Sequence, residues 1–119
     1  MSSTSPVRNL PFDDTYTAAD GPAGIDRRTK PSGLVELSAG FVTFETAGST
    51  DPWTLPYEEV FYVIDGELTI HCDGAAVVGR PGDVLTLEKG ITVVYEGAAG
   101  TRVFFSLVPA NWLELRDQA

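Results

Sequence analysis

From Leu34 onward, short runs of alternating apolar and polar residues are separated by turns rich in Gly and Asp. This period of two predicts strands at 34–38, 41–46, 58–64, 67–72, 75–79, 83–87, 91–96 and 101–108. Asp65-Gly66 and Asp73-Gly74 predict tight hairpin turns, because glycine adopts positive φ without steric cost. Several short strands at this even spacing predict an all-β sandwich or closed barrel.

The two ends of the chain have a different pattern. Prolines and glycines interrupt the first 32 residues, so we expect an irregular N-terminal arm over 1–32 and a single β-barrel domain over 33–119. The tail from Ala110 to Gln118 predicts one short helix, with Trp112 and Leu113 packed back on the barrel.

Glu59 is the most informative single residue, because alternation places it on a face that is otherwise apolar and aromatic. The neighbours that share this inward face are Trp53, Leu55, Tyr57, Phe61 and Val63. By the same parity Leu68, Ile70 and Cys72 point inward, His71 points outward, and Ile91, Val93 and Tyr95 share one face. The opposite face of strand 58–64 is also largely apolar, which suits a second sheet or a dimer partner.

The spacing around Glu59 resembles that of the cupin family. Glu59 and Gly66 match the second half of the motif G-x5-H-x-H-x3-E-x6-G, and residues 82–90 match the start of G-x5-P-x-G-x2-H-x3-N. The resemblance implies a single-domain cupin, which is a double-stranded β-helix or jelly-roll barrel. The three histidine positions of the motifs fall on Trp53, Leu55 and Val93. A divalent transition metal needs several N, O or S ligands, so we expect no metal and no other cofactor.

A narrower resemblance is to the cupin domain of the ethanolamine-utilisation family EutQ. The stretches that carry it are GFVTFE, PWTLPYEE, VIDGEL, GDVLTLEKG and VPANW. That family also lacks the metal-binding histidines. The resemblance implies an acetate-kinase-like activity with ATP and a divalent cation, or a role in bacterial microcompartments. The sequence contains no phosphate-binding loop of the form G-x4-G-K-[ST].

The residues themselves favour proton-transfer chemistry. Burial disfavours the charged form of a carboxyl, so the pKa of Glu59 should be raised, and such a group serves as a general acid or base. Tyr57 would donate a hydrogen bond to a substrate oxygen or to Glu59. The residues expected to contact the substrate are Trp53, Leu55, Phe61, Val93 and Tyr95. This set predicts a metal-independent enzyme of the isomerase, lyase or cyclase type acting on a small organic substrate.

Two alternatives to this hypothesis stay open. The barrel is a non-catalytic binder of a small ligand, or Glu59 is structural and pairs with the backbone or with an arginine such as Arg102.

Other polar residues are weaker candidates. Arg27, Arg28 and Lys30 form a basic cluster that is either solvated or a clamp for phosphate or carboxylate. Lys89 is a candidate anion ligand at the rim, and Glu45 a candidate group at the barrel mouth. Glu58 should face away from Glu59.

Charge and composition limit which kinds of partner and which cellular compartment we expect for the protein. The net charge of −9 argues against binding to nucleic acid. No apolar run approaches the roughly 18 residues of a membrane span, and the N-terminus does not resemble a secretory signal. A single cysteine, Cys72, excludes an intrachain disulfide and suits the cytoplasm. Because unpaired strand edges favour self-association, we expect a homodimer. The expected partner other than a second copy is a small-molecule substrate.

Overall fold

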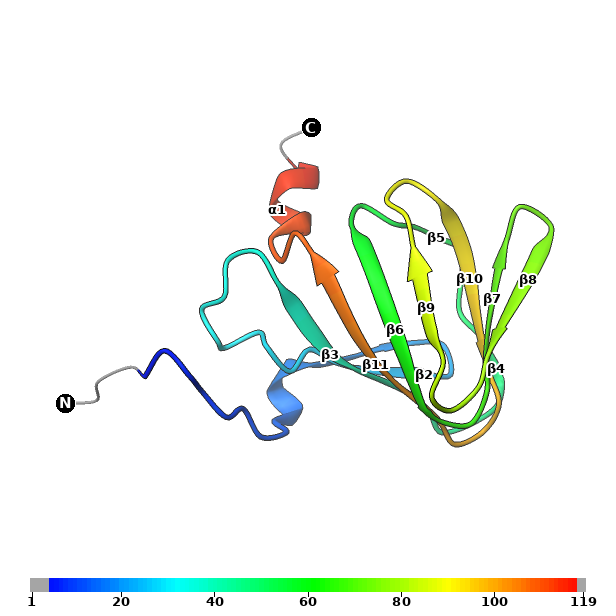
Figure 1. Cartoon of the computed structure of the whole chain (residues 1–119), viewed down its shortest axis with the longest axis horizontal. Helices are drawn as coiled ribbons and strands as arrows, with labels where there is room; N and C mark the ends of the chain where they lie inside the picture. The colour runs from blue at the N-terminus through cyan, green and yellow to red at the C-terminus, as the bar shows by residue number, and fades with distance from the viewer. Residues whose placement is uncertain (1–4, 118–119) are drawn as a thin grey trace.

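Two antiparallel β-sheets face each other and form a barrel, and a short C-terminal helix lies at one end (Figure 1). The computed structural model describes residues 5–117. None of the helices in this range has the length and apolar character needed to cross a bilayer.

The larger sheet has six strands in the order β1-β2-β3-β11-β6-β9. Its strands are β1 (Thr17–Asp20), β2 (Ala23–Asp26), β3 (Ser38–Phe44), β6 (Glu58–Asp65), β9 (Val84–Leu87) and β11 (Thr101–Val108). The smaller sheet has the order β4-β10-β7-β8, and β5 pairs with β10 outside that path. Its strands are β4 (Gly48–Ser49), β5 (Trp53–Thr54), β7 (Leu68–Cys72), β8 (Ala75–Gly79) and β10 (Thr92–Gly97). A 3-10 turn, η1 (Asp14–Tyr16), precedes β1, and helix α1 (Trp112–Asp117) follows β11.

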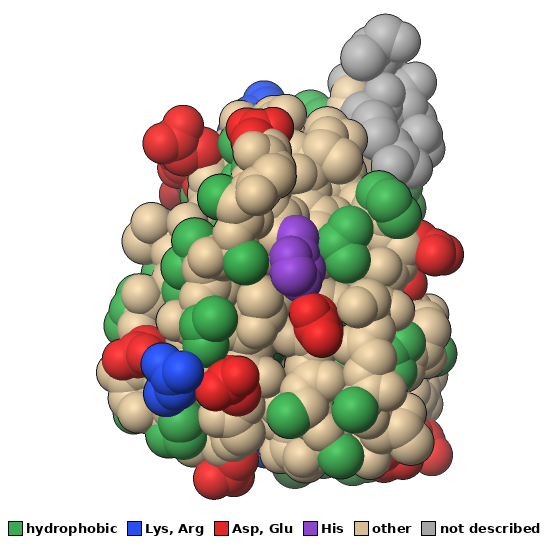
Figure 2. All heavy atoms as spheres, turned by 90° about the vertical axis from the view of Figure 1, so that its right-hand side faces the viewer, with side chains coloured by type: hydrophobic (Ala, Val, Ile, Leu, Met, Phe, Trp, Pro, Cys, Tyr) green, Lys and Arg blue, Asp and Glu red, His purple; other side chains and the backbone are tan. Residues whose placement is uncertain are grey.

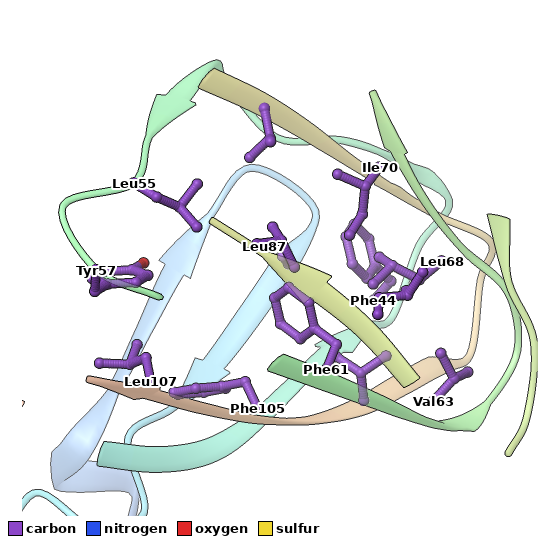
Figure 3. Close-up of a cluster of buried hydrophobic side chains, with 14 residues drawn as sticks. Phe44, Leu55, Tyr57, Phe61, Val63, Leu68, Ile70, Leu87, Phe105 and Leu107 are labelled. Atoms are coloured by element: carbon purple, nitrogen blue, oxygen red, sulfur yellow. The ribbon is translucent and has the colours of Figure 1, made fainter. Parts of the chain in front are cut away.

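The core lies between the two sheets and follows the expected alternation. Along β11, every second residue from Thr101 to Leu107 is buried, and β6 alternates in the same way. Figure 3 shows Phe61, Phe105 and Leu107 of the larger sheet together with Leu68 and Ile70 of the smaller sheet in the space between the strands. Each such side chain removes apolar area from water at about 25 cal/mol per Å², and this burial holds the two sheets together.

The strand predictions agree with the structure over most of the barrel. Strands 75–79 and 101–108 coincide with β8 and β11, and strands 58–64, 67–72 and 83–87 differ from β6, β7 and β9 by one residue at one end. Strand 91–96 is shifted by one residue from β10. Asp73 and Gly74 both have positive φ, 52° and 76°, as the predicted hairpin turn requires. The two-residue strands β4 and β5 were not predicted, because they are too short to show a pattern.

The prediction of separate strands at 34–38 and 41–46 was wrong. One strand, β3, runs from Ser38 to Phe44 and passes through Gly40, while residues 34–37 are an exposed loop. Gly40 is compatible with the strand because its missing side chain leaves room for the backbone of Asp26, whose carbonyl oxygen a Cβ would strike. A close approach of two backbones is a common reason for glycine within a strand.

The N-terminal segment is also more ordered than predicted. Residues 17–26 form the β1–β2 hairpin, and β2 pairs with β3, so the hairpin extends the larger sheet. The sequence signal was hidden because these strands consist largely of small residues with weak strand propensity. Backbone pairing with β3 supplies the order instead.

The C-terminal helix is present, and it packs as predicted at one of the two expected residues. The Trp112 ring meets the rings of Trp53 and Tyr57 edge to face, with centroids 5.7 and 5.4 Å away. Leu113 is 47% exposed, so it covers the barrel only in part.

We predict that Gly97→Ala destabilises the barrel. A Cβ at Gly97 would strike the ring of Phe44, which is fully buried and cannot retreat. Overpacking of this kind costs about 1–3 kcal/mol, and urea unfolding would show it as a lower midpoint.

Gly24→Ala is the matched control in another strand, β2. A Cβ there comes no closer than 3.8 Å to the carbonyl oxygen of Thr43, which is ordinary contact. Its free energy of unfolding should stay within about 0.5 kcal/mol of the wild-type value. Equal shifts for both variants would contradict the packing argument.

Candidate functional site

The barrel contains a cavity of about 350 Å³ between the two sheets. Its walls come from β1, β2, β3, β6 and β11 of the larger sheet, from Trp53, Leu68 and Tyr95 of the smaller sheet, and from Ala110, Trp112 and Leu113. Most of the wall is apolar or aromatic. Arg27, Lys30 and Leu113 of the lining are exposed and mark the mouth, whereas Ala19 is exposed near the turn of the β1–β2 hairpin.

Glu59 lies in this wall with only 8% of its surface exposed. The hydroxyl of Tyr95, from β10 of the opposite sheet, donates a hydrogen bond to its Oε1 at 3.1 Å. Burial raises the pKa of Glu59 from 4.5 to about 8, although the hydrogen bond from Tyr95 opposes the shift. The raised pKa predicted from the sequence is therefore present, and Glu59 is mainly protonated at neutral pH.

The second oxygen of Glu59 faces the cavity. Within residues 5–117 no buried side-chain nitrogen or oxygen lacks a hydrogen-bond partner. Oε2 of Glu59 makes no hydrogen bond in this part of the chain, so it must keep contact with the cavity space. Because Tyr95 donates to Oε1, the proton of the neutral carboxyl is best placed on Oε2.

Tyr57 lies at the same cavity but does not bond to Glu59. Its hydroxyl oxygen accepts a hydrogen bond from Nε1 of Trp53 at 3.0 Å. Burial, and next the nearby charge of Glu59, raise the pKa of Tyr57, so its hydroxyl stays protonated and can donate into the cavity. Tyr57 was expected to donate a hydrogen bond either to Glu59 or to a substrate oxygen. The bond to Glu59 comes from Tyr95 instead. A hydrogen bond from Tyr57 to a bound molecule stays a prediction.

Five of the seven predicted site residues line the cavity together: Trp53, Tyr57, Glu59, Phe61 and Tyr95. Leu55 and Val93 are each 1% exposed and lie in the core outside the cavity lining. The extended run is interrupted between Thr54 and Glu58, where Leu55 pairs its backbone with Ile91 and Gly90. Val93 pairs with Trp53 of β5. These local contacts direct both side chains into the packed part of the barrel.

The basic cluster divides in two. Arg28 bonds to Asp26 at 2.7 Å and lies over the ring of Phe41, whereas Arg27 and Lys30 line the cavity. The sequence identified these cations as a candidate clamp, but it did not connect them with Glu59. The β1–β2 hairpin, which the sequence did not predict, makes that connection.

The other candidates lie elsewhere. Glu45, Glu58 and Lys89 are exposed and do not line the cavity. Arg102 donates to Oγ1 of Thr43 at 3.3 Å and stacks over Phe41, so it is not the partner of Glu59.

The residues at the cupin ligand positions do not fit a divalent transition metal. Leu55 and Val93 carry no ligand atom, Trp53 donates its ring N–H to Tyr57, and only Glu59 supplies oxygen. No group of three or more His, Cys, Asp or Glu in the described residues is arranged to hold an ion. His71, predicted to point outward, lies on the outer surface (Figure 2), 2.8 Å from the carboxylate of Glu96.

Comparison with known proteins shows the family of this chain. The family model described as ethanolamine utilisation protein EutQ matches residues 26–114. The protein named acetate kinase EutQ from Escherichia coli is 33% identical over 79 residues, which cover 66% of this chain and 33% of that protein. The chain therefore spans about a third of the length of this curated relative.

Solved structures extend the likeness to the fold. A putative ethanolamine utilisation protein Q from Salmonella typhimurium is 28% identical, with a TM-score of 0.66 over 74% of this chain and 70% of that chain. A Cupin 2 conserved barrel domain protein from Salinispora arenicola has a TM-score of 0.73 at 14% identity, over 96% and 98% of the two chains. The fold is an all-β cupin barrel.

The buried carboxyl predicts a pH dependence of stability. The pKa of Glu59 is about 8 in the folded state and near its ordinary 4.5 when unfolded. The proton therefore stabilises the fold fully below about pH 4.5, and this stability is lost as pH rises through 8. We expect the free energy of unfolding of wild type, relative to Glu59→Gln, to fall by a few kcal/mol between pH 5 and pH 9.

Urea unfolding at a series of pH values measures this difference. Glu58→Gln is the matched control, because Glu58 precedes Glu59 in β6 but is exposed on the opposite face of the strand. A wild-type curve that stays parallel to the Glu59→Gln curve across the whole range would show that Glu59 is not buried as described.

Proposed function

Because this chain belongs to the EutQ family and encloses a cavity within its cupin barrel, we propose that it binds a small organic molecule there and transfers protons through Glu59. The observation that carries this proposal is a carboxyl with a pKa of about 8 whose Oε2 faces the cavity. A group with a pKa close to the working pH is efficient both as a donor and as an acceptor of protons.

Glu59, Tyr95 and Tyr57 each have a different role in the proposed reaction. Protonated Glu59 gives its Oε2 proton to a substrate oxygen, and Tyr95 stabilises the carboxylate that remains. The carboxylate then takes a proton from a neighbouring carbon of the substrate, which returns Glu59 to its starting state and leaves an isomerised product. Tyr57 donates a hydrogen bond to the same region and orients the substrate. No step in this scheme uses a metal ion.

The relatives supply a second candidate, which is phosphate transfer between ATP and acetate. It is favoured by the name acetate kinase, which the curated relatives carry. This chain corresponds to about a third of the E. coli protein, so we propose the activity only as an alternative for the barrel.

We also propose a homodimer in the cytoplasm. Strands β1 and β9 end the larger sheet, and among residues 5–117 no further strand pairs with the outer edge of either one. Pairing with a second copy removes such an edge.

The test of the proposed chemistry is hydrogen–deuterium exchange at carbon. A panel of aldehydes, ketones and 2-oxo acids is incubated with the protein in D₂O, and proton NMR follows the C–H signals next to the carbonyl. At least one compound should exchange, and Glu59→Gln should slow that exchange by about 10²-fold or more, because it removes the proton donor.

Glu58→Gln should exchange at the wild-type rate. An unchanged rate in Glu59→Gln would overturn the role of Glu59. Binding without any exchange across the panel would favour a non-catalytic binder.

The kinase alternative has a separate test. The protein is incubated with acetate, ATP and Mg²⁺, and acetyl phosphate is trapped with hydroxylamine. Under the proton-transfer proposal we expect no product above the protein-free control. Product formed equally by wild type and Glu59→Gln would favour the kinase candidate, since that reaction does not require an acid at this position.

A further inference from the structure

The charges of the cavity lining are separated into two ends. Arg27 and Lys30, which follow β2, lie at the mouth, whereas Asp20 lies at the turn end of the β1–β2 hairpin. In the register of β1 and β2, Asp20 pairs with Ala23 at the turn, and Arg27 directly follows Asp26 at the open end. Arg27 follows Ala23 by four residues, and four residues span about 13 Å at 3.3 Å per residue in a strand.

Different charges of the lining affect the pKa values of Tyr57 and Tyr95. Burial is the largest cause that raises the pKa of both Tyr57 and Tyr95. Among the smaller causes, the positive charge of Arg27 lowers the pKa of Tyr57, and the negative charge of Asp20 raises that of Tyr95. Among the charges near the opening, Arg27 therefore acts on Tyr57, and Asp20 acts on Tyr95.

The two cations are available to a ligand. Between residues 5 and 117 the arginine ion pairs join Arg28 to Asp26 and Arg80 to Glu67. The side chains of Arg27 and Lys30 make no hydrogen bond or ion pair within this range. In a chain with a net charge of −9, two such cations at one apolar opening form a local site for an anion.

The cavity also limits the size of that anion. At roughly 30 Å³ per water-sized group, its 350 Å³ hold about a dozen non-hydrogen atoms. Acetate has only four, so it would leave most of the space empty. Phe105 and Leu107 line the cavity from β11, which lies between β6 with Glu59 and the β2–β3 pair that leads to the cations. Together with Phe61 of β6, they favour an apolar body over a second charge.

We propose that Arg27 and Lys30 bind the carboxylate of a monocarboxylic acid of about four to nine carbons, whose apolar body extends along Phe105 and Phe61. In a substrate, the other end of this body presents a carbonyl group to Glu59. Guanidinium and ammonium groups form charge-assisted hydrogen bonds with carboxylates, and Arg27 can do so in bidentate geometry. The inference rests on the proposed use of this cavity as a ligand site. It adds the class of substrate. It also assigns the selection of that substrate to Arg27 and Lys30, which lie outside the strands that carry Glu59 and Tyr95.

The test compares each acid with its own primary amide, which has nearly the same shape but no charge. The panel contains straight-chain, branched and phenyl-substituted acids of four to nine carbons, and isothermal titration calorimetry at pH 7 measures the affinities. At least one acid should bind wild type 10-fold or more tightly than its amide. In Arg27→Gln/Lys30→Gln the acid should fall to the affinity of the amide, while the amide is unchanged.

Lys89→Gln, which removes an exposed cation away from the cavity, should keep the wild-type preference. Equal binding of acid and amide, a preference that survives in the double variant, or no binding by any acid would overturn the proposal. The preference should persist in Glu59→Gln, because the clamp does not use that carboxyl. A preserved preference without proton exchange in any compound would overturn the proposed catalysis and leave the carboxylate site intact.

Discussion

The hydrogen bond from Tyr95 to Glu59 is the interaction on which the interior of this barrel depends. It joins β10 of the smaller sheet to β6 of the larger one across the cavity. A carboxyl with so little exposure would be costly in its charged form, and one hydroxyl donor does not compensate for the lost water. The group therefore stays neutral near pH 7, and the barrel holds a proton in a place that water scarcely reaches.

A second set of contacts keeps the cavity open rather than collapsed. Trp53, Tyr57 and Trp112 meet edge to face, and the Trp53 ring N–H is bonded to the Tyr57 hydroxyl. Rings held in this way have little freedom to turn into the empty space. The short helix α1 therefore contributes to the site, because its first residue supports the wall that carries Tyr57.

The likeness to other cupins shows how one barrel supports different chemistry. The fold is shared with a cupin from Salinispora arenicola at only 14% identity, which is evidence for architecture and not for activity. The cupin ligand positions hold Trp53, Leu55 and Val93 in this chain. Leu55 and Val93 pack in the core and Trp53 donates a hydrogen bond to Tyr57, so these positions serve packing in this barrel. The retained Glu59 is thereby left in an apolar setting, which is the origin of its raised pKa.

Local patterns in the sequence determined the strands from Glu58 onward, the turn at Asp73-Gly74 and the inward direction of Glu59, because alternation and positive φ act over neighbouring residues. The raised pKa of Glu59 also followed from the apolar character of its face. The tertiary structure alone decided that Tyr95 rather than Tyr57 bonds to Glu59, and that Leu55 and Val93 lie outside the cavity. It also brought the β1–β2 hairpin, with Arg27, to the mouth. These features depend on distances between segments far apart in the chain, which are set by how the two sheets pack and not by the order of residues within one strand.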